Sequence, residues 1–239
     1  MPQRLHTQHL GLAEYEPTFR AMQAANKSRT PETPDAIWLL EHPPVFTLGL
    51  AGKPEHVLAP GDIPVIKIDR GGQVTYHGPG QLVVYLMLDV KCLGYGVKEL
   101  VNRIEQSLID LLGEYGINSF RLKGMPGVYV DSPSLVKGRG ANLASLPVRE
   151  RGWRERVRAD DANLAKIAAI GLRIANHATY HGLSLNIDMD LEPFSRINPC
   201  GYEGLAVTQM RDLGVTDNMA VIGEKLVAQL QRNIYKMSS

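Results

Sequence analysis

Hydrophobic residues recur along this chain with two periods, which predict a mixture of helices and strands. Spacings of three and four predict helices over 12–26, 97–113 and 218–236; in the first, Leu12, Tyr15, Phe19 and Met22 share one face. Short apolar runs bounded by turn-forming residues predict strands. These runs cover 36–41, 45–49, 64–69, 82–90, 127–130, 164–174 and 180–187.

The order of these elements predicts the fold class and the domain organisation. Helices interleaved with strands predict an α/β (α+β) fold, in which a mixed sheet is flanked by helices. The run 82–90 is apolar throughout, as in a central strand covered on both faces. A chain of 239 residues suits one domain, 1–239.

The segment 132–163 differs from its surroundings, because it is rich in arginine and glycine and has no sustained period. We expect an exposed insertion. Its basic run 149–158 could recognise an acidic partner, but a solvated surface loop is the simpler interpretation.

Composition and charge narrow the function classes. A net charge of +1 with 44% hydrophobic residues indicates a globular protein whose electrostatics favour neither nucleic acid nor a membrane surface. The sequence has no signal-peptide pattern and no apolar run of membrane-spanning length. We therefore expect a cytoplasmic protein, in which at least one of the two cysteines could be a free, catalytic thiol.

The segment 70–81 is dense in glycine and lies between two predicted strands. Its glycines permit tight turns and a close approach of the backbone to a ligand. Backbone N–H groups beside Gly71 and Gly72 could hold a carbonyl or carboxylate oxygen, and Arg70 and His77 add polar side chains. A turn needed only for topology explains the glycines equally well. The pattern of a phosphate-binding loop is absent.

The tetrad Thr-Tyr-His-Gly occurs at 75–78 and again at 179–182. Chance alone explains such a repeat, so it does not indicate an internal duplication. Each tetrad nevertheless ends a β-prone pair in a histidine, His77 or His181, where a strand could enter a cleft. A purely structural histidine is the commoner case.

Cys200 lies between Pro199 and Gly201, which restrict the turn before it and permit a sharp turn after it. A cysteine presented in this way suits a nucleophile, provided that a base lies nearby. An inert buried cysteine is the alternative. Cys92 has no presenting glycine, and we assign it an inert role.

Lys166 interrupts an apolar stretch, LAKIAAIG, in which both alternating faces are hydrophobic. Burial lowers the pKa of a lysine because it disfavours the ammonium form, and such a lysine can act as a general base. The alternative is a lysine that points to water from an edge strand.

Several of these segments together resemble one family. RGGQVTYHGPGQLVVY, KIAAIGLRI, TYHGLSLNID and INPCG occur in that order, preceded by EHPPVFTLGLAG. They resemble the octanoyl-[acyl carrier protein]:protein octanoyltransferases, also called lipoyl transferases. The resemblance spans about 37–208 apart from the insertion. It implies a fold similar to the catalytic domain of biotin and lipoate protein ligases.

The resemblance also implies a mechanism and a site. The family's cysteine, which matches Cys200, takes the octanoyl group from acyl carrier protein as a thioester. The family's lysine, which lowers the pKa of that cysteine, matches Lys166 rather than Lys137, because IAAIG follows Lys166 directly. The implied substrate-binding residues are Arg70, Gly71, Gly72, Gln73, Val74, Thr75, Tyr76, His77, Ala169, Ile170, Gly171, His181, Gly182, Leu183 and Ser184.

The implied acceptors are lysines of the lipoyl domains of 2-oxoacid dehydrogenases and of the glycine-cleavage carrier protein. No cofactor, metal, nucleic acid or membrane is implied, and we expect a monomer. Three alternatives stay open: an ATP-dependent lipoate or biotin ligase, a carrier-to-carrier octanoyl amidotransferase, and a non-catalytic acyl-binding module. The string KGRG at 137–140 superficially resembles a ligase loop, but it lies in the insertion.

Overall fold

The computed structural model describes residues 5–131, 164–199 and 205–235. Its strands are β1 (Leu5–Leu12), β2 (Asp35–Glu41), β3 (Val45–Leu48), β4 (Val65–Lys67), β5 (Val74–His77), β6 (Gln81–Met87), β7 (Ser119–Leu122), β8 (Met125–Asp131), β9 (Leu164–Ala175), β10 (Ala178–Asn186) and β11 (Ala206–Val207). Its helices are α1 (Tyr15–Lys27), α2 (Val90–Leu93), α3 (Val97–Glu114) and α5 (Met219–Ile234). Short 3₁₀ turns are η1 (Pro54–His56), η3 (Glu192–Arg196) and η5 (Arg211–Leu213).

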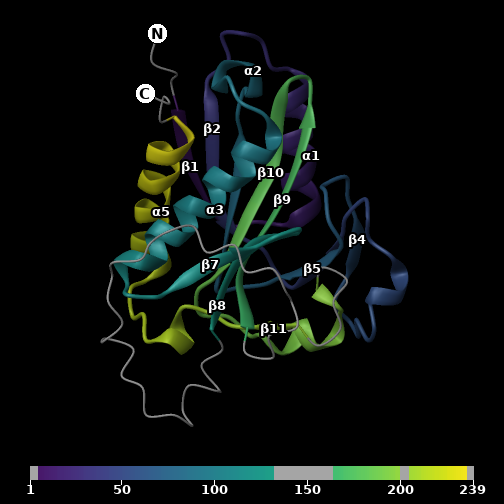
Figure 1. Cartoon of the computed structure of the whole chain (residues 1–239). Helices are drawn as coiled ribbons and strands as arrows, with labels where there is room; N and C mark the ends of the chain where they lie inside the picture. Colours follow the sequence, from purple (N-terminus) through teal and green to yellow (C-terminus); the bar gives the residue numbers. More distant parts are fainter. Residues whose placement is uncertain (1–4, 132–163, 200–204, 236–239) are drawn as a thin grey trace.

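Two sheets organise these elements (Figure 1). The large sheet has the order β1-β2-β6-β10-β9-β8-β7, with β11 beside β9. Most neighbours are antiparallel, but β1 runs parallel to β2 and β11 parallel to β9. The small sheet has the order β4-β3-β5. The predicted mixed sheet flanked by helices is therefore confirmed.

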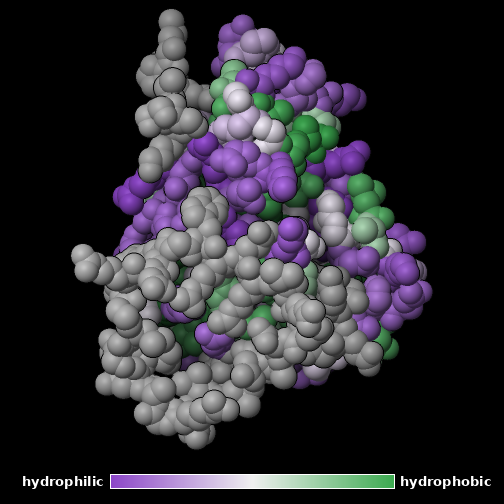
Figure 2. All heavy atoms as spheres, in the orientation of Figure 1, coloured by the Kyte–Doolittle hydropathy of each residue, from purple (hydrophilic) through white to green (hydrophobic). Residues whose placement is uncertain are grey.

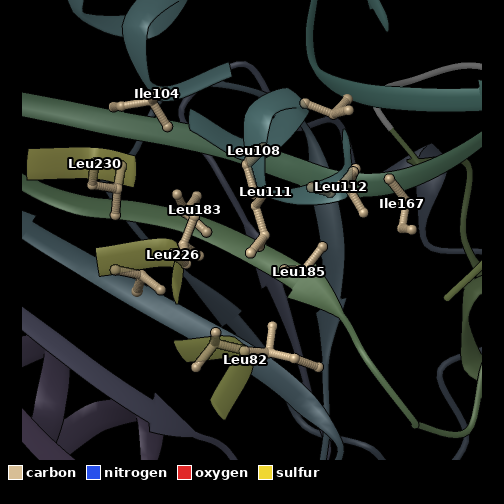
Figure 3. Packing of buried hydrophobic residues seen from close by; sticks show 14 of the residues in the cluster. Leu82, Ile104, Leu108, Leu111, Leu112, Ile167, Leu183, Leu185, Leu226 and Leu230 are labelled. Carbon is tan, nitrogen blue, oxygen red and sulfur yellow. The ribbon is translucent and has the colours of Figure 1, made fainter. Parts of the chain in front are cut away.

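The main core lies between the large sheet and the helices α3 and α5. Figure 3 shows Leu108 and Leu111 of α3 and Leu226 of α5 packed around Leu183 and Leu185 of β10. All five side chains are buried. Burial of each such side chain contributes about 1.5–3 kcal/mol, which is why the apolar stripes of these helices determine their position.

The opposite face of the large sheet is covered in two parts. Helix α1 packs Met22 against Val83 and Tyr85 of β6. The small sheet lies beyond the end of α1 and carries the glycine-rich segment between β4 and β6. The region between the small sheet and the large sheet is where the candidate site lies.

The predicted elements correspond closely to the observed ones, with specific exceptions. Strand β1 was not predicted, because most of it is exposed and it has no alternation of buried and exposed residues. The predicted helix 12–26 begins instead at Tyr15, and Leu12 ends β1 with 62% of its surface exposed. Strands β5 and β7 were also missed, the former because it lies inside the glycine-rich segment.

Asp131 and Leu164, which flank the segment 132–163, are direct partners between the antiparallel strands β8 and β9. In general, a tight turn of two to five residues is enough to join two antiparallel strands that are paired in this way. The predicted insertion itself lies outside the described residues. Figure 2 shows the described part of the visible face as mainly hydrophilic, with hydrophobic residues in small groups.

Candidate active site

A cavity of about 390 Å³ lies between the glycine-rich segment and strands β6, β9 and β10. This volume falls in the usual range for small-molecule sites. Nearly all predicted site residues that the structure describes line this cavity. They are Arg70, Gly71, Gly72, Gln73, Val74, Thr75, His77, Lys166, Ala169, Ile170, Gly171, His181, Gly182, Leu183 and Ser184.

Tyr76 is the exception, since it is not among the residues that line the cavity. Side chains alternate along a strand, so Tyr76 of β5 points to the face opposite that of Thr75 and His77, which line the cavity. Its ring packs against Phe46 and Phe194, with ring centroids 5.4 and 5.5 Å apart. The structure thus places Tyr76 in a hydrophobic cluster beside the site.

Small residues paired across β9 and β10 form one wall of the cavity. Gly171 pairs with Gly182, and Ala169 pairs with Ser184. A Cβ atom on Gly182 would lie 2.0 Å from the carbonyl oxygen of Val84, so no larger residue fits there without movement of the backbone. The short side chains leave space over the sheet that large ones would fill.

Arg70 holds the glycine-rich segment in place. Its Nη2 atom donates to the carbonyl oxygens of Thr47 and Gln73, each at 2.9 Å, and its Nη1 atom donates to the carbonyl oxygen of Gly71 at 2.9 Å. Gly72 has φ +92°, which favours glycine. Arg70 is therefore a structural clamp for this loop as well as part of the cavity wall.

The backbone N–H of Gly71 donates to the carbonyl oxygen of Leu172 at 3.2 Å. This bond attaches the glycine-rich segment to β9, beyond the stretch of β9 that pairs with β8. The sequence-based expectation that this N–H could hold a ligand oxygen is therefore wrong, because the group is already used.

His77 is buried beside the cavity, and its tautomer follows from its neighbours. The side-chain amide nitrogen of Gln81 donates to Asn186, so its Oε1 atom accepts from Nδ1 of His77 at 2.6 Å. Nε2 of His77 is then left to accept from the Thr47 hydroxyl at 3.4 Å. Burial, reinforced by the neighbouring His42, lowers the pKa of His77 to about 3. The ring is neutral at pH 7.

His181 lies in β10 with φ +60°, an uncommon backbone conformation for a residue with a side chain. Its Nε2 atom lies 2.9 Å from a carboxylate oxygen of Asp69, and the Tyr180 hydroxyl donates to the other oxygen. Burial lowers the pKa of His181 to about 4 despite the carboxylate. A neutral His181 therefore donates Nε2–H to Asp69. Burial alone would raise the pKa of Asp69, but the His181 and Tyr180 bonds outweigh it and lower that pKa.

Lys166 is only 5% exposed and lies in β9, where it pairs with Tyr129 of β8 on one side and Val207 of β11 on the other. The alternative of an edge-strand lysine that points to water is therefore wrong. Its Nζ atom donates to the carbonyl oxygen of Pro126 at 3.0 Å and lies 5.4 Å from the centre of the Tyr129 ring. A bulge in the β8–β9 pairing occurs at this point.

Cys200 lies outside the described residues, but both flanks of its segment are described. Pro199 lines the cavity, and Asn198 donates its backbone N–H to the carbonyl oxygen of His56 at 2.9 Å. On the other side, β11 pairs with Ala165 and Lys166, and Thr208 donates to the carbonyl oxygen of Lys166 at 3.0 Å. The strand that carries Lys166 is thus hydrogen-bonded to the segment that follows Cys200.

Cys92 lies exposed on α2, outside the cavity lining. A small desolvation and the carboxylate of Asp89 raise the pKa of its thiol, which disfavours the reactive thiolate.

The sequence analysis missed several contributors to the site. Asp69 directly precedes Arg70, and this position next to the glycine-rich segment was an available signal. Glu105 was a second signal, because it is a charged residue aligned with Val101 and Leu108 on a helix face that is otherwise apolar. Asp69 and Glu105 do not themselves line the cavity. The missed residues that do line it include Tyr15, Val83, Tyr85, Val97, Val101, Met125, Pro126, Asn186 and Val207.

Within the described residues, no three His, Cys, Asp or Glu side chains are arranged to hold a metal ion. No helix in the described part of the chain is long and apolar enough to cross a membrane.

The chain resembles known proteins in sequence and in fold. Residues 14–231 match the lipoyl protein ligase A/B catalytic domain. An octanoyltransferase from Laribacter hongkongensis is 52% identical over 230 residues, which cover 96% of each chain. A bipartite lipoate protein ligase from Thermoplasma acidophilum shares the fold, with a TM-score of 0.65 and 13% identity over 97% of this chain and 85% of that one.

A biotin protein ligase from Aquifex aeolicus is more distant, with a TM-score of 0.51 and 10% identity over 98% of this chain and 71% of that one. The predicted resemblance to this fold family is confirmed. By its sequence and its fold, the chain belongs to the octanoyltransferases, within the lipoyl protein ligase A/B catalytic domain family.

Proposed function

We propose that this acyltransferase moves an octanoyl group from acyl carrier protein to a lysine of a lipoyl domain, through a thioester on Cys200. One observation carries the proposal: a single cavity is lined by the buried Lys166, by a wall of small residues and by Pro199, the residue before Cys200. The acceptors that we propose are lipoyl domains of 2-oxoacid dehydrogenases and the glycine-cleavage carrier protein.

In the first half-reaction, Lys166 takes the proton of the Cys200 thiol. The thiolate then attacks the thioester carbonyl of octanoyl-acyl carrier protein. The new sulfur–carbon bond forms as the carrier's sulfur–carbon bond breaks, and the departing thiolate takes a proton from the Lys166 ammonium. A thiolate leaves readily, so the step needs no stronger acid.

In the second half-reaction, the amine of the acceptor lysine attacks the acyl-enzyme. An amide bond forms, the bond to Cys200 breaks, and the proton lost by the amine passes through Lys166 to the cysteine sulfur. Lys166 thus accepts and returns one proton in each half-reaction. The Gly71 N–H does not serve the oxyanion in this scheme, because it is bonded to Leu172.

The acyl chain would lie along the small-residue wall of β9 and β10. Full burial of an eight-carbon chain contributes roughly 5 kcal/mol, at about 0.8 kcal/mol per methylene. Val83 and Tyr85 of β6 line the same cavity and would limit how far the chain extends. Chain length would therefore be selected by depth rather than by polar contacts.

An ATP-dependent ligase is the second candidate, because a lipoate protein ligase shares the fold. The KGRG string that resembles a ligase loop lies at 137–140, outside the described residues. A ligase would not need Cys200, so the two candidates differ in their requirement for ATP and for this thiol.

We further propose a cytoplasmic, monomeric enzyme of one domain, with 132–163 as an insertion. The direct pairing of Asp131 with Leu164 supports the insertion, because it leaves the sheet continuous across the segment. A catalytic free thiol suits a reducing compartment.

The test is intact-mass analysis after the protein is mixed with octanoyl-acyl carrier protein, followed by a lipoyl domain, without ATP. We expect an octanoylated protein and then an octanoylated lipoyl domain. Cys200→Ala should abolish both products, whereas Cys92→Ala, the matched control, should keep both. Transfer that needs ATP and survives Cys200→Ala would establish the ligase instead. An octanoylated carrier domain that replaces acyl carrier protein as the preferred donor would indicate a carrier-to-carrier amidotransferase.

A further inference from the structure

Glu105 is a buried carboxylate that the proposed chemistry does not use. It lies on α3 and is 4% exposed, on a helix whose neighbouring buried residues are mostly apolar. Ile104, the residue before it, belongs to the main core shown in Figure 3. A buried carboxylate is costly unless it is paired and hydrogen-bonded, so its partners indicate what it does.

Glu105 and Lys166 are linked through one peptide group, to which both side chains are hydrogen-bonded. The backbone N–H of Gly127 donates to Oε1 of Glu105 at 3.0 Å. The carbonyl oxygen of the same peptide group, that of Pro126, accepts from Nζ of Lys166 at 3.0 Å. Glu105 and Lys166 therefore bind opposite ends of the Pro126–Gly127 peptide.

This arrangement strengthens both hydrogen bonds. A carboxylate that accepts from a peptide N–H polarises the group and makes its carbonyl oxygen a better acceptor. The negative charge also acts directly on Lys166, and this attraction opposes the rise that burial causes in the pKa of Glu105.

The local sequence fits this role. A Cβ atom on Gly127 would lie 2.7 Å from Cε of Lys166, and Gly127 has φ +131°. Glycine therefore lets the lysine side chain pass close to the peptide that it binds. Arg121 of β7, whose Nε atom lies 3.4 Å from Oε2 of Glu105, approaches the second carboxylate oxygen.

We propose that Glu105 is a positioning residue for Lys166. Glu105 holds the Pro126–Gly127 peptide, and the carbonyl oxygen of Pro126 in turn fixes the Lys166 amine at the cavity. The proposal rests on the catalytic role proposed for Lys166. Several described elements around Lys166 contribute charged or titratable groups. These groups are Glu105 of α3, Arg121 of β7, and Tyr129 and Asp131 of β8.

Two variants separate the hydrogen bond from the charge. Glu105→Gln keeps an oxygen for the Gly127 N–H but removes the charge, whereas Glu105→Ala removes both. The matched control is Ser107→Ala, on the same helix: Ser107 is fully buried and its hydroxyl donates to the backbone carbonyls of Arg103 and Gln229, away from the cavity.

The first measurement is the single-turnover rate of octanoyl transfer from octanoyl-acyl carrier protein to Cys200. We expect at least about a tenfold loss in Glu105→Ala, because the amine is no longer held, and substantial rescue in Glu105→Gln. Ser107→Ala should lower the melting temperature without slowing transfer. Equal transfer rates in the parent chain and in Glu105→Ala would overturn the proposal, as would losses that simply follow the melting temperatures of all three variants.

The second measurement does not depend on activity. Competitive labelling of lysines with acetic anhydride over a pH series, read by mass spectrometry of the Lys166 peptide, reports the protonation of this amine. The midpoint for Lys166 should move to lower pH in Glu105→Gln, since a negative charge has been removed. An unchanged labelling midpoint of Lys166 in Glu105→Gln would contradict the proposed electrostatic effect of Glu105 on the Lys166 amine. If the parent chain forms no acyl-enzyme, the proposed function fails, and the labelling series still tests the link between Glu105 and Lys166.

Discussion

Gly171 of β9 and Gly182 of β10 are direct partners across the sheet, and neither position has free space for a methyl group. A Cβ atom on Gly171 would lie 2.9 Å from Cδ of Arg70, and one on Gly182 would lie 2.0 Å from the carbonyl oxygen of Val84. The first neighbour is a flexible side chain, but the second is backbone. The glycine pair therefore lets strands β6, β9 and β10 and the loop that carries Arg70 come close together at the cavity.

Gly182→Ala should destabilise the fold, because the backbone of β6 must move to admit the methyl group. We expect the free energy of unfolding to fall by about 1–3 kcal/mol, measured by thermal or urea denaturation. Gly113→Ala is the control: Gly113 lies in α3 with no atom near its Cβ position, and the change should stabilise the helix by about 0.5–1 kcal/mol. A Gly182→Ala variant as stable as the parent chain would show that the strands can separate freely here.

Ala169→Leu should shift the proposed chain-length preference toward shorter acyl groups. The added carbons would occupy space over β9, opposite Ser184, that we assign to the acyl chain. Transfer from hexanoyl-, octanoyl- and decanoyl-acyl carrier protein gives the measurement. We expect hexanoyl transfer to persist while octanoyl transfer falls by about tenfold, which corresponds to roughly two unburied methylenes. Equal losses with all three donors would indicate general damage rather than a shortened pocket.

Arg70→Lys should weaken the site although it conserves the charge. The guanidinium bridges Thr47, Gly71 and Gln73 through two nitrogen atoms, and a lysine ammonium does not reproduce this fork. We expect kcat/KM for octanoyl-acyl carrier protein to fall by about tenfold, from the loss of roughly 1.5 kcal/mol of hydrogen bonding. Arg173→Lys, at an exposed position on β9 outside the cavity lining, should leave kcat/KM unchanged. An unchanged kcat/KM in the Arg70→Lys variant would contradict the role of Arg70 as a clamp for the loop.

Acidification should destabilise the fold before most carboxylates titrate. Burial lowers the pKa of His42 and His181 to about 4 and that of His77 to about 3, so the folded protein holds them neutral while the unfolded chain protonates them near pH 6.5. Their contribution to stability is therefore present above about pH 6.5 and is lost as pH falls toward 4. Between pH 7 and 5 we expect a loss of roughly 1–2 kcal/mol for each histidine.

Urea denaturation over this pH range measures the effect. His42→Gln should flatten the pH dependence, because one of the three neutral rings is removed. His6→Gln, at an exposed position on β1, is the control and should keep the full slope. A slope that His42→Gln leaves unaltered would place the acid sensitivity elsewhere.

Much of the fold was predictable because local periodicity reports which face of an element is buried. The stripe of α3, with Leu100, Ile104 and Leu108, and the unbroken apolar run of β6 correspond to observed, buried elements. Strand β1 was not predictable, because it is largely exposed and is held mainly by backbone bonds to β2.

The sequence by itself determined which residues could carry chemistry: a lysine in apolar surroundings, a cysteine between proline and glycine, and glycines beside histidines. Tertiary structure decided what each of these groups does, because exposure and protonation depend on partners far away in the chain. Pairing with β8 and β11 buried Lys166, and the Leu172 carbonyl occupied the N–H of Gly71. The link from Glu105 to Lys166 passes through a peptide group whose orientation no side-chain pattern encodes, so only the folded backbone reveals it.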